Sequence, residues 1–136
     1  MIEASQLVTD VYGYWPRFEG AYVLAATIEA DATIFYELGE RTFSIDLHWW
    51  LGAEDHYPGG PIIFEAADLH RRIRMAFCVQ DLRLHTFFCS NPQVCDLVLT
   101  AATGAVSTEG GFELSFKYDA ARVVSVTPCD EIGRPL

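Results

Sequence analysis

The chain has 136 residues, of which 51% are hydrophobic and 21% are charged, and its formal net charge is −10 at pH 7. This balance is typical of a globular domain with its own buried core, and it excludes a disordered chain. The negative charge repels the phosphates of nucleic acids and membranes, so we expect neither as a partner and expect a basic protein instead.

The N-terminus and the cysteines indicate a cytoplasmic protein. Residues 1–6 contain no basic group and no continuous apolar run, so they do not resemble a signal peptide. No apolar stretch approaches the roughly 20 residues needed to cross a bilayer. The 4 cysteines include no Cys-x-x-Cys pair, and we expect reduced thiols rather than disulfides or zinc ligands. We therefore expect no cofactor and no metal.

The first predicted element is a short amphipathic helix at residues 3–12, where apolar residues recur at helical spacing. Ser5 is a candidate N-cap, and Gly13 followed by Pro16 ends the helix. From Tyr22 onward the pattern changes to the period of two that is typical of strands.

Alternation and short apolar runs predict about eight strands, at residues 22–29, 33–38, 43–50, 72–80, 82–88, 94–100, 112–118 and 122–127. Residues 52–61 form the main loop, and residues 103–111 form a Gly-rich link. Because consecutive strands with short connections pair antiparallel, we predict a single mainly β domain over residues 1–136. It is either an antiparallel curved sheet or a two-layer sandwich, with a short N-terminal helix.

Three side chains on one predicted strand form the first part of a candidate partner-binding site. Asp46, His48 and Trp50 share one face of the strand at residues 43–50, opposite an apolar row. A carboxylate and an imidazole two residues apart can share a proton or a metal ion, but no third ligand at a suitable spacing accompanies them. We expect this face to be solvated, with Trp50 as an exposed contact for a partner protein.

The loop that follows carries the second part of the site. Glu54, Asp55 and Tyr57 lie within residues 52–61, and binding residues are disproportionately found on such loops. Residues 1–70 hold 12 acidic and 2 basic residues, whereas residues 71–136 hold 7 of each. An acidic loop with an aromatic residue suits a basic groove on a partner, although a solvated connector has the same composition.

No catalytic motif is present in the sequence. It contains no Gly-x-Ser-x-Gly, no phosphate-binding loop and no Gly-x-Gly-x-x-Gly between a strand and a helix. We therefore predict a binding protein rather than an enzyme. The alternatives are a hydrolase that uses Asp46 and His48, and a small β-barrel or sandwich that binds an apolar ligand between aromatic side chains. The aromatic residues that would line such a cavity are Phe35, Trp49, Phe64 and Phe87.

The most distinctive segment is Gly13-Tyr14-Trp15-Pro16-Arg17-Phe18, directly before the first strand. Pro16 holds Trp15 extended, which favours a rigid corner where a helix meets a sheet. Trp15 and Phe18 either seal the end of the sheet or anchor a partner.

Together with two further segments, this one resembles the immunity protein 50 family, antidotes encoded beside bacterial polymorphic toxins. The other segments are Asp81-Leu82-Arg83-Leu84, followed by Phe88-Cys89-Ser90-Asn91-Pro92-Gln93, and Arg122-Val123-Val124-Ser125-Val126-Thr127-Pro128. The chain departs from the family pattern at Glu19-Gly20, where the family has His-Asp, and at Tyr22, where it has an acidic residue. The resemblance implies a divergent member that neutralises a cognate toxin domain by stoichiometric binding. An exposed sheet edge would also allow a homodimer.

Overall fold

The computed structural model of this chain describes residues 2–30, 41–53, 68–86 and 93–136. The described elements are β1 (Ile2–Glu3), α1 (Gln6–Tyr12), β2 (Tyr22–Ala30), β3 (Arg41–Trp49), β4 (Arg71–Thr86), β5 (Val94–Leu99), β6 (Thr103–Thr108) and β7 (Glu113–Pro128). The predicted mainly β class with a short N-terminal helix is confirmed. The strand predicted at residues 33–38 lies outside the described residues.

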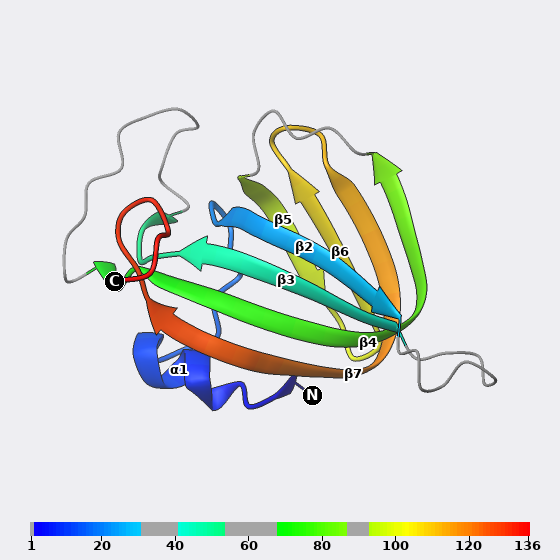
Figure 1. The fold of residues 1–136 in the computed structure, drawn as a ribbon, viewed down its shortest axis with the longest axis horizontal. Coiled ribbons are helices and arrows are strands. Elements are labelled where there is room, and N and C mark those ends of the chain that lie inside the picture. Colours follow the sequence, from blue (N-terminus) through cyan, green and yellow to red (C-terminus); the bar gives the residue numbers. More distant parts are fainter. Residues whose placement is uncertain (1, 31–40, 54–67, 87–92) are drawn as a thin grey trace.

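The described strands form one sheet in the order β2-β3-β4-β7-β6-β5, with β1 paired to β7. Neighbours along this order pair antiparallel, and the two-residue β1 pairs parallel to β7. Of the two predicted architectures the curved sheet is confirmed, because the sheet curls into a half-barrel (Figure 1). We call the concave side of β2-β3-β4, which faces β5 and β6, the inner face, and the opposite side the outer face.

Strands β4 and β7 are each 16 residues long and run through both halves of the half-barrel (Figure 1). The sequence predicts two strands in each place, with breaks at Asp81 and at Asp119-Ala120, and these breaks are wrong. Register shifts interrupt the β4–β7 pairing at several points, two of them between Cys78 and Asp81. A β-bulge bends a strand without ending it, so the sheet turns here while the pairing continues.

Strand β6 lies where the sequence predicts a Gly-rich link, so that prediction is also wrong. Gly104 explains the error, because it serves close packing and not a turn. The ring of Phe116 from β7 lies against Gly104, and a Cβ atom at residue 104 would be 2.6 Å from Phe116 Cε2. A glycine within a strand often marks such a close approach.

The two edge strands meet at one end of the half-barrel. Tyr22 of β2 and Gln93, directly before β5, form an isolated antiparallel bridge. The Gly20 N–H donates to the Val94 carbonyl (2.9 Å), and the Val94 N–H donates to the Ala21 carbonyl (2.6 Å). Further along, β2 pairs with β3 and β5 pairs with β6, with no other partner strand among the described residues. The half-barrel is therefore joined at this end and leaves two strand edges elsewhere.

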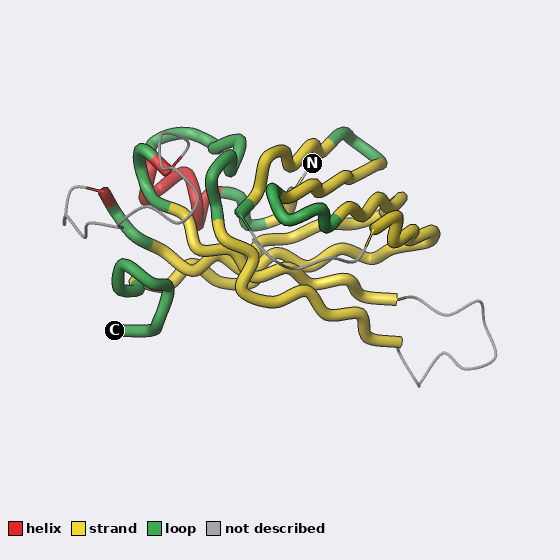
Figure 2. Tube along the Cα trace, turned by 90° about the horizontal axis from the view of Figure 1, so that it is seen from above, coloured by secondary structure: helices red, strands yellow, loops and turns green. Residues whose placement is uncertain are grey.

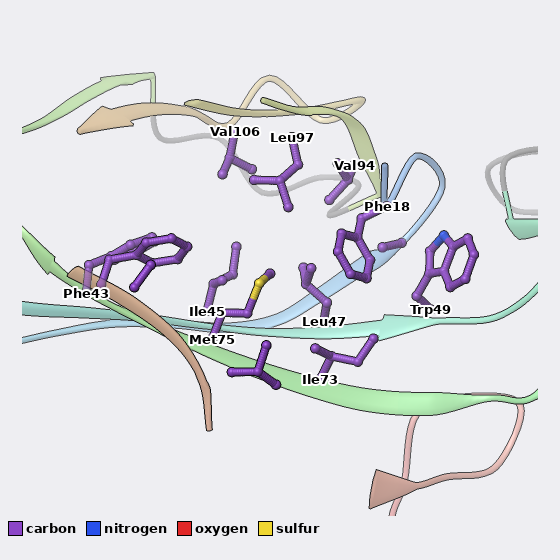
Figure 3. Close-up of a cluster of buried hydrophobic side chains, with 14 of the residues drawn as sticks. Phe18, Phe43, Ile45, Leu47, Trp49, Ile73, Met75, Val94, Leu97 and Val106 are labelled. Carbon is purple, nitrogen blue, oxygen red and sulfur yellow. The ribbon is translucent and has the colours of Figure 1, made fainter. Parts of the chain in front are cut away.

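The core lies between the two halves of the sheet. Figure 3 shows Ile45 and Leu47 of β3 opposite Leu97 and Val106 of β5 and β6. An aromatic cluster continues this core, with ring centroids 4.9 to 6.2 Å apart, and it comprises Phe43, Phe77, Phe116 and Tyr118.

Helix α1 and the segment after it close the core at the end where Trp49 lies. The rings of Tyr12 and Phe18 meet the Trp49 ring edge-on, at 4.9 and 5.8 Å. The Trp49 indole N–H donates to the Glu19 carbonyl (3.2 Å). Phe18 is 1% exposed, so the sealing role is confirmed for this residue, whereas Trp15 is half-buried. Figure 2 shows α1 on one side of the β2-β3-β4 layer and the C-terminus on the other.

The helix ends where the sequence predicts. Gly13 has a φ of +82° and donates its N–H to the Thr9 carbonyl at 2.7 Å, as a glycine beyond a helix commonly does. Ser5 occupies the N-cap position, but its side chain makes no capping hydrogen bond. Within the described ranges, no helix combines the length and the apolar character needed to cross a membrane.

Candidate functional site

The strand face with Asp46, His48 and Trp50 is covered and not solvated. Their exposed fractions are 6%, 1% and 5%. The predicted alternation is confirmed, because Ile45 and Leu47 lie in the core while Asp46 pairs with Arg74. The expectation of a solvated face with an exposed Trp50 is wrong.

The cover over His48 is the C-terminal turn, residues 129–136, which folds back against the outer face of the sheet. Asp130 organises this turn by accepting hydrogen bonds from the main-chain N–H groups of Ile132 (3.0 Å) and Arg134 (2.8 Å). Gly133 lies close to His48, since a Cβ atom added to this glycine would be 3.3 Å from His48 Nδ1. Figure 1 shows the turn in red beside the end of β3 and the start of β4. The sequence identifies these residues only as a tail.

Beneath the C-terminal turn, two imidazoles share a hydrogen bond. His48 Nε2 and His70 Nδ1 are 2.8 Å apart, so one of these nitrogens carries the hydrogen and the other accepts it. The Trp50 ring stacks on His70 with a centroid distance of 5.1 Å, and the Tyr22 ring stacks on Trp50 at 5.9 Å. We call His48, His70, Trp50 and Tyr22 the histidine cluster.

Burial keeps both histidines neutral near pH 7. It lowers the pKa of His48 from 6.5 to about 4, with a further lowering from the neighbouring His70 and Arg72, while Asp130 opposes the shift. Burial also lowers the pKa of His70, against the opposing effect of the nearby carboxylates of Asp68, Glu131 and Asp130. The two imidazoles of the histidine cluster are therefore neutral and hydrogen-bonded to each other.

Asp46 is held by two arginines from β4. Arg74 donates from Nε to Oδ1 (2.6 Å) and from Nη2 to Oδ2 (2.8 Å), which is the planar two-bond geometry of an arginine–carboxylate pair. Arg72 Nη2 lies 3.7 Å from the same carboxylate. Asp46 and His48 are thus engaged by different partners, so the geometry does not support the acid–base pair considered from sequence.

The predicted site residues are only partly described by the structure. Asp46, His48 and Trp50 are close together, whereas Glu54, Asp55 and Tyr57 lie outside the described residues. Among the described side chains, no three of His, Cys, Asp and Glu come together as metal ligands do. The buried polar side chains described at this site hydrogen-bond one another or an arginine of β4, and His48 lies next to the C-terminal turn.

Sequence reasoning missed the participation of His70, Tyr22 and Gly133. His70 is 22 residues from His48 along the chain, and Gly133 is 85 residues away, so neither pairing has a local signal. Tyr22 is opposite His48 in the β2–β3 register, but the sequence predicts a strand between them at residues 33–38, so pairing consecutive predicted strands does not bring them together.

The contact between the C-terminal turn and His48 predicts unequal effects for two glycine substitutions. Gly133 and Gly52 both have a φ of +85°, but a Cβ atom at Gly52 would have no neighbour within 4 Å. We expect Gly52→Ala to lower the free energy of unfolding by about 1 kcal/mol through backbone strain, and Gly133→Ala by about 2 kcal/mol. Urea denaturation of both variants measures the difference, and equal losses would contradict this contact.

Comparisons of this chain with models of known protein families, with curated proteins and with solved structures give no match.

Proposed function

We propose that this protein is an immunity protein, which binds a cognate bacterial toxin domain one to one and blocks it. Two features of the chain support this proposal. The first is the resemblance of three segments to the immunity protein 50 family, of which Gly13–Phe18 is the most specific. The second is a concentration of acidic residues in two connections of the sheet.

The distribution of charge is the observation that carries the proposal. Residues 31–40 join β2 to β3, and residues 54–67 lead from β3 toward β4. These two segments contain 6 of the 19 acidic residues and none of the 9 basic residues. Each segment holds three of these acidic residues, and such an excess of negative charge attracts a basic protein surface and raises the rate of encounter with it. Many toxin domains that attack nucleic acids need such a basic surface.

The segments that carry the resemblance have structural roles in this fold. Phe18 packs in the core, Asp81–Leu84 belong to β4, and Arg122–Pro128 form the last part of β7. At the place where the chain departs from the family pattern, Gly20 has a φ of +81° and the Ala21 N–H donates to the Phe18 carbonyl. Glu19-Gly20 therefore forms a turn, and the proposal does not depend on a His-Asp pair at this place.

A growth-rescue assay tests the proposal. We expect a toxin-like C-terminal domain to be encoded next to this gene, and it is induced in a sensitive host with and without this protein. We expect rescue together with a complex of equal stoichiometry, measured by calorimetry on the purified, inactivated toxin domain. Growth arrest that persists in the presence of folded protein would contradict an immunity function.

The acidic residues of the loop predicted at residues 52–61 allow a more specific prediction. We expect the double variant Glu54→Lys, Asp55→Lys to lower the association rate with the toxin domain about tenfold at low salt, because it removes the attraction that steers encounter. Stopped-flow measurements from low to high ionic strength should show a weaker salt dependence for this variant. Glu3→Lys with Asp10→Lys, at exposed positions on β1 and α1, is the matched control. Equal slowing by both double variants would assign the effect to net charge and not to this loop.

A further inference from the structure

A groove separates the segment Trp15–Phe18 from the free side of edge strand β5. It has a volume of about 250 Å³, and its strand wall is Asp96–Leu99. The opposite wall begins with Trp15, whose ring meets Phe18 edge-on at 5.6 Å. Since Phe18 is buried in the core, this wall is held in place, and the most distinctive segment of the sequence thus borders an open strand edge.

Within the described residues, no strand pairs with the free side of β5 over Asp96–Leu99. Strand β5 is tied to the start of β2 through Gly20, Ala21 and Val94, and beyond that point β6 is its only strand partner in the described part of the chain. An edge strand presents a row of N–H and C=O groups that can pair with another strand. Proteins that recognise extended segments use this geometry, in which main-chain hydrogen bonds give affinity and neighbouring hollows select side chains.

The side chains around this edge define what would fit. Val98 is 47% exposed, and it lines the groove as well as two further hollows of about 440 and 190 Å³. A partner residue that packs on Val98 and Trp15 must therefore be apolar. Val98 is the one residue shared by these three hollows, which places it at the centre of the surface.

The charge beside the groove favours a basic partner segment. Arg17 lies 3.5 Å from Glu19, so its charge is balanced. Asp96 is exposed, and within the described residues no cationic group lies within 4 Å of it. The charged groups at this groove and directly beside it are Arg17, Glu19 and Asp96, one base and two acids, so their sum is negative, in agreement with the net charge of −10 of the whole chain.

We propose that the toxin domain inserts an extended segment into this groove and adds it to the sheet as a strand next to β5. The segment places an apolar side chain between Trp15 and Val98 and a basic side chain at Asp96. This inference rests on the proposed immunity function and names the surface and the binding mode. Strand addition continues the sheet order beyond β5 and covers one of its two open edges.

Hydrogen exchange with the inactivated toxin domain encoded next to this gene tests the binding mode. We expect amides within Asp96–Leu99 to become protected in the complex, because added main-chain hydrogen bonds slow their exchange. Amides of the other edge strand, β2, should keep their exchange rates. Protection confined to β2 would overturn the assignment to β5.

Paired lysine substitutions test the same surface through affinity. We expect Val98→Lys to weaken binding of the toxin domain at least about tenfold, because a charge at the centre of the edge blocks strand addition. Ile28→Lys is the matched control, since Ile28 is an exposed apolar residue on the other edge strand (54% exposed). Circular dichroism and urea denaturation establish that both variants are folded.

The outcomes separate the two proposals. If the wild-type protein binds and rescues while Val98→Lys binds equally well, the immunity function stands and the β5 groove is excluded. If Ile28→Lys alone weakens binding, the partner uses β2. If a second copy of this chain pairs at β5, sedimentation shows a dimer that Val98→Lys dissociates, and the toxin assignment of the groove is overturned. If the wild-type protein neither binds nor rescues, both proposals fail.

Discussion

Replacing Gly104 with alanine is expected to lower the free energy of unfolding by about 3 kcal/mol, because the new methyl group would overlap a buried aromatic ring. The added Cβ atom would overlap Phe116 Cζ and would lie 2.6 Å from Cε2 and 2.8 Å from Cε1. All three atoms belong to one rigid ring, and its Cζ atom lies on the axis about which the ring flips, so a flip would not remove the overlap. Phe116 is 4% exposed and packs against Phe43 and Phe77 at centroid distances of 5.2 and 4.9 Å, so the ring has little room to shift.

A double-mutant cycle isolates this contact from other effects of the substitution. We expect Gly104→Ala to destabilise a Phe116→Leu background by less than about 1 kcal/mol, since the smaller side chain leaves space for the methyl group. Urea denaturation of the wild type, the two single variants and the double variant gives the coupling free energy. The same loss in both backgrounds would mean that Gly104 is needed for its backbone and not for the approach of the ring.

Acidification from pH 7 to pH 5 is expected to lower the free energy of unfolding by about 2 kcal/mol through His48 alone. In the unfolded chain His48 has its ordinary pKa of 6.5, whereas in the folded protein burial lowers the pKa to about 4. Between these two values the unfolded state binds more protons, so stability is full above pH 6.5 and decreases as the pH falls toward 4. The lowered pKa of His70 acts in the same direction.

Two histidine variants test this pH dependence. We expect His48→Gln to flatten the dependence of unfolding free energy on pH between 7 and 5, whatever its effect on absolute stability. His85→Gln is the control, because His85 is exposed and hydrogen-bonds Ser115 at 2.7 Å on the surface. This variant should keep the slope of the wild type. A His48→Gln protein with the wild-type slope would show that the histidine cluster does not carry the effect.

The residues of β3 show which properties of the candidate site could be predicted from sequence and which could not. Alternation along β3 correctly assigned Ile45 and Leu47 to one face and Asp46 and His48 to the other. The sequence then predicted a solvated outer face, because polar side chains are usually exposed. This was wrong because a buried polar group is stable when it has partners, and the partners come from distant positions. Arg74 of the neighbouring strand β4 pairs with Asp46, and the C-terminal turn covers His48.

The lengths of the strands also depend on contacts that the sequence pattern does not predict. Asp81 and Gly104 interrupt the alternation of apolar and polar residues in the sequence, and the predicted strands end near them. In the folded chain the β4–β7 pairing bends at bulges near Asp81, and Gly104 accommodates the ring of Phe116. Both effects depend on which strand lies alongside, a fact that local propensity does not contain.

The sequence alone predicts the mainly β class, the short helix that ends at Gly13, the two faces of β3 and the strongly acidic character of the chain. These properties follow from residue types and their spacing over a few positions, because local sterics and hydrophobic burial depend on that spacing. Three features became known only from the folded structure: the sheet curls into a half-barrel, two histidines meet beneath the C-terminal turn, and Trp15 lines a groove beside β5. Such contacts join residues far apart in the chain, and they depend on how bulges and long strands bring those residues together, so no local pattern encodes them.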